Sequence, residues 1–440
     1  MAHWPLSTSM LHKNKIDLTQ KIPPLLLAAA RYVERHLKEA GFEAYLVGGG
    51  VRSLLLGLPI KDVDITTNAR PEQVQSIFKK TVPVGIEFGT IIVLYQHIPV
   101  EVTTYRHDAE YADGRRPVKV TFGETLEDDV LRRDFTVNGM AYDLEEGTVY
   151  DYVGGVEDLE ARLIRTIGRP EDRFNEDGLR PVRGCRFAAS LDFEFEERTL
   201  EAVFESLDTV KKIAVERFYD EWRKTLKIKK RDVFLNLLRE TGILQIFFPH
   251  SEKLLSHWHD LLPVLGRAHI LSMGAYAAYL LFYQYSLHRN PESFGKAQRA
   301  EVSRLLEHLK FPGREKRLAL ELLHSPFLPL AQGDHHLDRL KVKRLLAVVN
   351  RPWRKQHILF ARSFLPADIA EQLNDLSVEI LHSKEPLYIS QLAIGGNDLK
   401  ELNYRGTAIG DALESLLQVV LENPALNTRA ALLRQLEKSG

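Results

Sequence analysis

The strand candidates of this 440-residue chain are confined to the part before residue 158. Short apolar or alternating runs occur at 43–47, 61–66, 89–95 and 99–105, and helix-like spacing of apolar residues dominates from Asp158 to the C-terminus. Because strands and helices are segregated along the chain, we predict an α+β protein. It should have a head built on a small sheet, followed by all-helical domains.

The composition narrows the class of protein. Lys and Arg number 59 against 60 Asp and Glu, a net charge of −1, which excludes a uniformly basic nucleic-acid coat but not a local basic face. The single cysteine, Cys185, excludes an intrachain disulfide and a cysteine-cluster zinc site. No apolar stretch reaches the roughly 20 residues of a membrane span, and the N-terminal residues lack a signal-like apolar run. We therefore expect a cytoplasmic protein that does not enter membranes, and infer no protein partner.

Proline and glycine punctuation gives the expected domain borders. We predict a leader at 1–22 that packs little, a sheet-containing head at 23–157 and three helical segments at 158–230, 231–350 and 351–440.

A glycine turn joins the first strand candidate to a helix. At Gly48, Gly49 and Gly50 there are no side chains, so backbone N–H groups at a helix start can approach a phosphate, and Arg52 adds a charged donor. The alternative is a turn that needs glycine only for its backbone angles and close packing.

Asp62 and Asp64 follow one short helix later, in an alternating run that places both on one face of a strand. Two neighbouring carboxylates favour a bound cation, and Mg²⁺ prefers such oxygen ligands. Glu101 is a candidate third carboxylate if its strand lies beside theirs. The alternatives are a solvated strand face for the pair and an exposed edge strand for Glu101.

Arg133 and Asn138 lie in a charged segment that also contains Phe135 and Val137. Arg133 has the chemistry to bind phosphate or ribose, and Asn138 to orient a sugar hydroxyl or the backbone. A salt-bridged surface is the alternative.

Asp177, Arg180, Arg183 and Arg186 recur every three residues and line one helical stripe. An Asp and an Arg so spaced match the Watson–Crick edge of C or A, because the carboxylate accepts from the exocyclic amine and the guanidinium donates to the ring nitrogen. The alternative is an intrahelical ladder of ion pairs, worth about 0.3–0.5 kcal/mol each.

A basic segment follows at 211–231, with nine basic and three acidic residues and with Phe218, Tyr219 and Trp222 interleaved. It suits an RNA backbone. An amphipathic helix with a lysine-rich wet side is the alternative.

Taken together, these segments resemble the class II tRNA nucleotidyltransferase and bacterial poly(A) polymerase family. The matching motifs occur in the family's order: GGGVR with DVD, RRDFTVNGMAYD, DYVGGVEDLEARLIRTIG, EDGLRPVRGCRFAA and AVERFYDEWRK. A further segment beginning at Ala393 resembles the C-terminal region of tRNA CCA-adding members.

The resemblance implies that the head at 23–157 is a catalytic, polymerase-β-like nucleotidyltransferase domain with a mixed sheet. The helical segments would be a neck at 158–230 that selects the nucleotide, a body at 231–350 and a tail at 351–440 that binds tRNA. Asp62 and Asp64 would hold Mg²⁺ for a two-metal transfer, with Glu101 as a third catalytic carboxylate. The expected partners are the tRNA 3′ end, CTP and ATP. The nucleotide-binding residues would be Gly49, Arg52, Arg133, Asn138, Asp177, Arg180, Arg183 and Arg186, with Asp177 and Arg180 as an amino-acid template.

The chain departs from the family pattern at three positions. Ser53 replaces the usual Asp after the Val-Arg pair, and Pro181 and Gly184 fall inside the template helix. Proline is tolerated only in a first turn, so we expect this helix to start close to Asp177.

Members of the family add CCA, CC only, A only or poly(A). The loop at 106–118 resembles that of tRNA-type members, so we favour complete CCA addition over partial addition or poly(A) synthesis. A catalytically silent RNA-binding protein is the alternative from another class. A metal phosphohydrolase is a second rival because of the His257-to-Asp260 segment, but the further ligands are not evident, and we expect a surface histidine cluster there.

Overall fold

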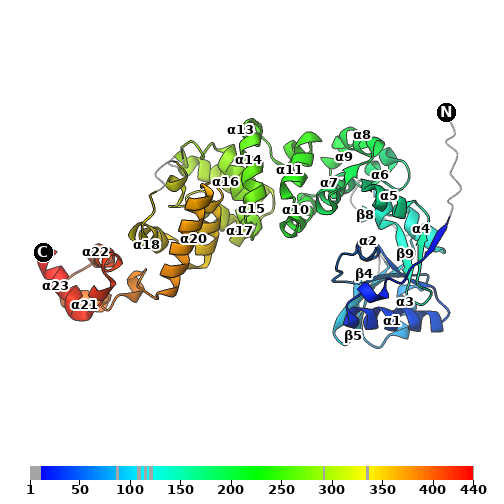
Figure 1. Cartoon of the computed structure of the whole chain (residues 1–440), viewed down its shortest axis with the longest axis horizontal. Coiled ribbons are helices and arrows are strands. Elements are labelled where there is room, and N and C mark those ends of the chain that lie inside the picture. The colour runs from blue at the N-terminus through cyan, green and yellow to red at the C-terminus, as the bar shows by residue number, and fades with distance from the viewer. Residues whose placement is uncertain are drawn as a thin grey trace. The chain divides into compact units, whose positions relative to one another are not determined.

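The computed structural model of the chain forms two compact units, Met1–Phe247 and Phe248–Gly440, and Figure 1 labels many of their elements. All strands among the described residues lie in the first unit, which confirms the predicted α+β class. None of the helices described is long and apolar enough to cross a membrane. The structure describes residues 11–85, 89–106, 111–112, 116–117, 122–290, 293–332 and 336–439.

The head is built on an eight-stranded sheet in the order β1-β10-β9-β2-β3-β6-β5-β4. Only β3 and β6 run parallel, and the other neighbours are antiparallel, so the sheet is mixed as predicted. The strands are β1 (His12–Lys15), β2 (Ala44–Val47), β3 (Asp64–Thr67), β4 (Thr81–Gly85), β5 (Thr90–Tyr95), β6 (Ile98–Thr104), β9 (Met140–Asp143) and β10 (Thr148–Asp151). Four two-residue strands lie outside this sheet: β7 (Tyr111–Ala112), β8 (Arg116–Pro117), β11 (Leu163–Ile164) and β12 (Glu194–Phe195).

The prediction that residues 1–22 pack little is wrong for the described part of that segment. β1 pairs along its whole length with β10, and Leu18 and Ile22 are buried. The backbone N–H of Leu18 donates to the hydroxyl of Tyr142. An edge strand is held by backbone hydrogen bonds, so the polar sequence of β1 did not reveal it.

The helices of the first unit begin with α1 (Pro24–Glu39), which has proline at its first position. Its buried face is Ala29, Ala30, Val33 and Leu37, at the spacing of a helix packed on a sheet. The others are α2 (Gly49–Leu55), α3 (Pro71–Ile77), α4 (Leu126–Leu131), α5 (Gly155–Ala161), α6 (Pro170–Glu176), α7 (Leu179–Leu191), α8 (Glu197–Glu205), α9 (Leu207–Val210), α10 (Val215–Lys224), α11 (Arg231–Glu240) and α12 (Ile243–Phe247).

The first unit extends beyond the neck border expected at 230/231. Helix α11 packs on α7, and Phe218 of α10 stacks on Phe247 of α12 with ring centroids 3.7 Å apart. Tyr219 and Trp222 of α10 are buried as well. The aromatic residues of the basic segment therefore belong to the core. Helix α10 is amphipathic, with Glu216, Asp220, Arg223 and Lys224 exposed and Glu221 buried.

In the second unit, helix α15 (Met273–Gln284) is central, because every residue from Met273 to Tyr283 is buried. The other helices are α13 (Glu252–Ser256), α14 (Trp258–Arg267), α16 (Lys296–His308), α17 (Gly313–Leu322), α18 (Arg339–Val348), α19 (Arg354–Arg362), α20 (Ala367–His382), α21 (Gly396–Glu401), α22 (Thr407–Glu422) and α23 (Arg429–Ser439).

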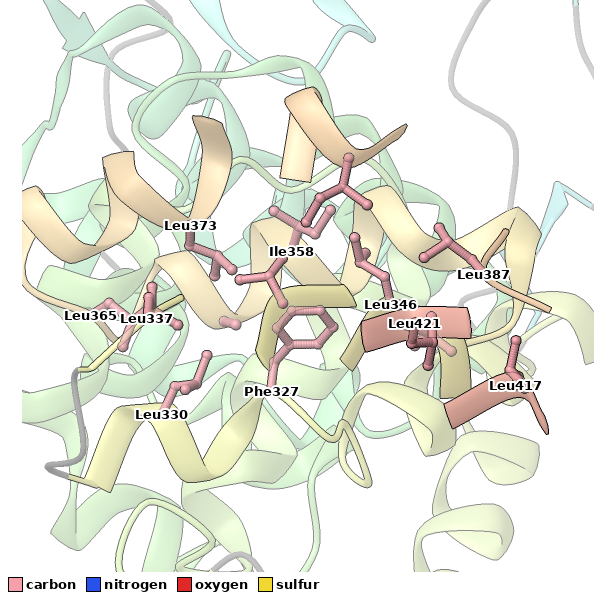
Figure 2. Packing of buried hydrophobic residues seen from close by; sticks show 14 residues of the cluster. Phe327, Leu330, Leu337, Leu346, Ile358, Leu365, Leu373, Leu387, Leu417 and Leu421 are labelled. Atoms are coloured by element: carbon pink, nitrogen blue, oxygen red, sulfur yellow. The ribbon is translucent and has the colours of Figure 1, made fainter. Parts of the chain in front are cut away.

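The body–tail border expected at 350/351 falls inside one apolar cluster. Figure 2 shows Phe327 and Leu346 from before that border packed with Ile358, Leu373 and Leu421 from after it. The proline at this point sits in a single 3₁₀ turn, Arg351–Trp353. It marks a bend in a continuous core rather than a gap between two cores.

Candidate active site

Three carboxylates gather where β3 and β6 run side by side. Asp64 opens β3, and its register partner on β6 is Glu101, so both side chains project from the same face. Asp62 precedes β3 by two residues and is exposed, as Asp64 and Glu101 are. Because β6 lies between β3 and β5, the alternative of an edge-strand Glu101 is wrong. The strand begins at Asp64, later than the predicted 61–66.

The carboxylates repel one another. Asp64 keeps some contact with solvent, but the protein around it removes much of its hydration, and the charges of Glu101 and Asp62 act in the same direction. These effects raise the pKa of Asp64 to about 6, and Arg133 only partly opposes them. A divalent cation would remove this repulsion, and a set of carboxylate oxygens fits the hard ion Mg²⁺.

The glycine turn brings two guanidinium groups close to the backbone. Gly48, with φ +71°, precedes α2, and a Cβ on it would lie 3.3 Å from Nη1 of Arg133. A Cβ on Gly49 would lie 3.4 Å from Nη2 of Arg52. The Nε atoms of both arginines are buried and lack a hydrogen-bond partner among the described residues. This concentration of N–H donors beside a helix start suits an anion.

Burial dominates the electrostatics of Arg52. It lowers the pKa of this guanidinium to about 10, with Asp134 opposing and the charges of Arg186 and Arg183 adding to the effect. Three positive charges, those of Arg52, Arg183 and Arg186, therefore repel one another in this site, and the single carboxylate of Asp134 offsets them only in part. A bound polyanion would relieve this repulsion.

Asp129 links the carboxylate strand to the glycine turn. It is fully buried and accepts hydrogen bonds from Thr66 Oγ1 of β3 (3.1 Å), from Arg133 Nη2 (2.7 Å) and from Arg132. Burial alone would raise the pKa of Asp129, but the charges of Arg133 and Arg132 outweigh it and lower that pKa to about 2. The sequence pattern did not single out Asp129, so its positioning role was missed.

A second chain of hydrogen bonds runs from the turn to helix α7. Arg52 donates to Asn138 Oδ1, and Asn138 Nδ2 donates to Asp134 Oδ1 at 2.9 Å. Arg183 of α7 donates to Asp134 Oδ2 from Nε (2.8 Å) and Nη2 (2.6 Å). Because Asp134 and Asn138 are buried, the alternative of a salt-bridged surface at this segment is wrong.

Helix α7 starts at Leu179, as expected from Pro181. The carboxylate of Asp177 accepts from the backbone N–H of Leu179 at 3.0 Å, and Pro181 falls in the first turn. Gly184 has a packing reason, since a Cβ there would come within 2.8 Å of the Phe195 ring.

The two expected template groups have protein partners. Asp177 accepts from Arg217 Nη2 at 2.7 Å. Arg180, almost fully buried, donates to Glu176 Oε2 at 2.5 Å and to the carbonyl of Arg173 at 2.9 Å. Both groups therefore lie at the start of α7 already engaged in charge-assisted hydrogen bonds.

The last two arginines of the stripe share Glu221 of α10. This carboxylate is buried and lies 2.5 Å from Arg186 Nε and 3.7 Å from Arg183 Nη1. The ring of Phe187 packs under the guanidiniums of Arg186 (4.0 Å), Arg52 and Arg183. Arg183 and Arg186 thus pair with carboxylates of other elements, so the alternative of an intrahelical ladder of ion pairs is wrong for these two arginines. Sequence reasoning missed Glu221 and Phe187, because nothing in their own segments marks them.

The geometry and the fold define a nucleotidyltransferase head followed by helical domains. The family model of the poly A polymerase head domain matches residues 44–165, and that of the probable RNA and SrmB-binding site of polymerase A matches residues 192–255.

More closely, the chain belongs to the CCA-adding enzyme family. It is 34% identical over 407 residues to the CCA-adding enzyme of Streptococcus thermophilus, covering 90% of this chain and 93% of the relative. It is 35% identical over 427 residues to that of Bacillus licheniformis, covering 94% and 97%. These matches confirm the family resemblance drawn from the motifs.

Solved structures agree with this assignment. The Bacillus stearothermophilus CCA-adding enzyme in complex with CTP matches with a TM-score of 0.76 and 28% identity, over 95% of this chain and 99% of that one. The Thermotoga maritima CCA-adding enzyme complexed with tRNA(CCA) shares the fold, with a TM-score of 0.64, 20% identity and coverage of 96% and 98%.

Proposed function

We propose that this chain adds CCA to the 3′ end of tRNA, using CTP and ATP and releasing pyrophosphate. The observation that carries the proposal is the pair of hydrogen-bonded chains in the site. One joins the strand of Asp64 to Arg133 through Asp129, and the other joins Arg52 to Arg183 through Asp134. The named CCA-adding relatives, matched over nearly their whole length, support the same activity. A substrate of this kind also supports the predicted cytoplasmic location.

Asp62 and Asp64 hold Mg²⁺ in this proposal, and Glu101 completes the carboxylate cluster. The metal ions of a two-metal site lower the pKa of the RNA 3′-hydroxyl and neutralise charge on the triphosphate. The raised pKa of Asp64 supports the assignment, because burial and then the charges of Glu101 and Asp62 disfavour the ionised carboxylate, which a bound cation would stabilise.

Gly49, Arg52 and Arg133 bind the triphosphate, and Asn138 orients Arg52 through its side-chain oxygen. The 3′-oxygen attacks the α-phosphorus, a new phosphorus–oxygen bond forms, and the bond from the α-phosphorus to the bridging oxygen breaks as pyrophosphate leaves. The hydroxyl proton passes to solvent or to a carboxylate. The arginines hold the departing charge.

Asp177 and Arg180 read the base, and Arg183 and Arg186 contact the nucleotide further along α7. The donor and acceptor order of the first two groups matches C and A and opposes G and U. Since Arg217 and Glu176 engage these groups, every nucleotide must displace both protein partners, and the choice among bases rests on the donor and acceptor order.

A partial adder of CC or A, or a poly(A) polymerase, would use the same head. Most of the 106–118 loop that favoured the tRNA type lies outside the described residues. The deciding experiment uses three tRNA transcripts, ending before CCA, after C and after CC, with each nucleotide alone and with CTP plus ATP in Mg²⁺. Completion of all three at CCA, followed by a stop, is expected. Arrest at CC, addition of A only, or long A tails would replace the proposal with the matching alternative.

Asp62→Ala distinguishes the enzyme from an RNA-binding protein without activity. We expect incorporation to fall by at least about 10³-fold, since a lost metal ligand removes several kcal/mol of transition-state stabilisation and each 1.4 kcal/mol is tenfold in rate. Binding of tRNA in a filter assay should be largely kept. Asp208→Ala, which removes an exposed carboxylate outside the site, is the matched control. Equal incorporation by the two variants would contradict the assigned role of Asp62.

A further inference from the structure

A second group of metal-ligating side chains lies in the second unit. His257 immediately precedes α14, Asp260 lies in its first turn, and His288 follows the end of α15. One ligand atom of each lies within 4.8 Å of the others, and Nδ1 of His257 is 3.5 Å from Oδ2 of Asp260. The expectation of a surface histidine cluster is wrong for His257, which is buried with 9% of its surface exposed, whereas His259 is exposed.

The surroundings of His288 leave its nitrogens without partners. Its ring packs on those of His257 (centroids 4.3 Å apart) and Tyr283 (5.0 Å). Both ring nitrogens are shielded from solvent and have no hydrogen-bond partner within the described part of the chain. Ring packing alone would account for the position of the side chain but would leave two buried polar atoms unsatisfied, which is energetically costly. A ligand that accepts a nitrogen lone pair would remove this cost for one of the two nitrogens.

The backbone around the three side chains is held in place. Tyr283 donates from its hydroxyl to the carbonyl of Asp260 at 3.2 Å, which joins α15 to α14. The backbone N–H of Leu287 donates to the carbonyl of Phe282 at 2.9 Å, which fixes the turn that carries His288. The ligand groups therefore sit on elements that already contact each other, as a pre-organised site requires.

We propose that His257, Asp260 and His288 bind one divalent transition-metal ion, zinc foremost, with water at the fourth position. Two imidazole nitrogens and one carboxylate oxygen form a donor set typical of zinc, and ligands about 2.0–2.1 Å from such an ion lie roughly 3.3 Å from one another. The His257–Asp260 separation of 3.5 Å is close to this value, and the ligand atom of His288 lies within 4.8 Å of the other two, in reach of a side-chain rotation. Mg²⁺ prefers oxygen ligands alone, so this site differs in metal preference from the carboxylates of the head.

The test uses the full, untagged chain, because a polyhistidine tag would itself bind zinc. The metal-stripped protein is titrated with Zn²⁺ against a chromogenic chelator, in excess Mg²⁺ to occupy the carboxylates of the head. We expect the wild-type protein to bind one equivalent of Zn²⁺. The variants His257→Gln and His288→Gln should bind Zn²⁺ at least about 100-fold more weakly, since loss of a residue that only hydrogen-bonds to a ligand already lowers metal affinity about 10- to 100-fold. His259→Gln, which changes an exposed neighbour of the same type, should bind as wild type.

Replacement of zinc by Co²⁺ gives a second readout. Wild type and His259→Gln should show the intense visible absorption of a four-coordinate cobalt site with nitrogen ligands, and the other two variants should not. Circular dichroism melts of the metal-free proteins verify folding, and Asp260→Asn, at an exposed ligand, serves if a histidine variant unfolds. Equal Zn²⁺ affinity of wild type and all folded ligand variants, or equal loss in His259→Gln, would overturn the proposal.

Discussion

Replacement of Asp134 by Asn tests whether the hydrogen-bonded chain between the glycine turn and α7 holds the site together. The side chain is 10% exposed and accepts two hydrogen bonds from Arg183, one from Asn138 and one from the backbone of Phe135. Asp134→Asn keeps the size of the side chain and removes its charge. Arg183 then retains Glu221, at 3.7 Å from its Nη1, and the more distant charge of Asp177 as anionic neighbours.

The expected loss of stability is about 2–3 kcal/mol. Burial alone would raise the pKa of Asp134, but Arg183 and then the hydrogen bond from Asn138 lower it from 3.8 to about 2. At about 1.4 kcal/mol per pKa unit, this shift corresponds to roughly 2 kcal/mol. Breaking a buried ion pair costs about 3–5 kcal/mol, and the partial exposure of Arg183 reduces that figure.

The same shift sets the pH dependence. Because the pKa of Asp134 is lower in the folded than in the unfolded chain, its contribution is fully present above about pH 5 and is lost as the pH falls toward 2. Asp134→Asn lacks this contribution, so the difference in unfolding free energy between wild type and variant should shrink over that interval.

Urea unfolding gives the free energies, and amide hydrogen exchange of α7 locates the change in the first unit. Asp192→Asn, at an exposed carboxylate paired with Lys230, is the control and should lose less than about 1 kcal/mol. Adding Arg183→Gln to Asp134→Asn should recover part of the loss, because no unpaired charge remains. Equal losses for the Asp134 and Asp192 variants, or a double variant that loses the sum of both changes, would refute the reasoning.

Two further predictions concern packing and the carboxylates. Gly184→Ala should lower the free energy of unfolding in urea by about 1–3 kcal/mol, since the added Cβ would overlap the Phe195 ring. The control Gly266→Ala, with open space around it in α14, should be neutral or slightly stabilising. Equal effects of the two substitutions would argue against the close packing of α7. Because the pKa of Asp64 is raised to about 6, protons should compete with Mg²⁺ for this carboxylate below pH 6. At subsaturating Mg²⁺ the rate of nucleotide incorporation should then fall about tenfold per pH unit below 6; more Mg²⁺ should restore it and a chelator should abolish it. A fall that excess Mg²⁺ does not restore would contradict a metal-binding role.

Much of the head could be predicted because its signals are local. The apolar run that became β5, the strand pattern that became β6 and the glycine turn before α2 are visible in the residues themselves. Strands β9 and β10 were missed because they are buried on both faces and show no alternation of polar and apolar residues. Strand β4 was missed because it follows α3 after only three residues, with no glycine or proline between them to mark a boundary. Local pattern does not report how many sides of a strand are covered.

The candidate site was predicted as a set of residue types but not as a network. Spacing alone indicated Asp62, Asp64 and the arginines of α7, and pairing of β3 with β6 then brought Glu101 beside Asp64. The partners of those arginines come from segments far along the chain. Glu221 lies in a helix of mixed charge, where a carboxylate beside basic residues suggests only a surface ion pair. Such partnerships depend on tertiary packing, which no spacing rule contains.

The pairing of β1 with β10 has a consequence for self-association. All four residues of β1 are exposed, and two are lysines, which deters another strand from adding to this side of the sheet. All four residues of β10 are buried, with Val149 and Tyr150 among them. A chain shortened to start at Pro23 would leave β10 as a bare apolar rim with free N–H and C=O groups. By covering β10, strand β1 thus protects the sheet against strand exchange and aggregation.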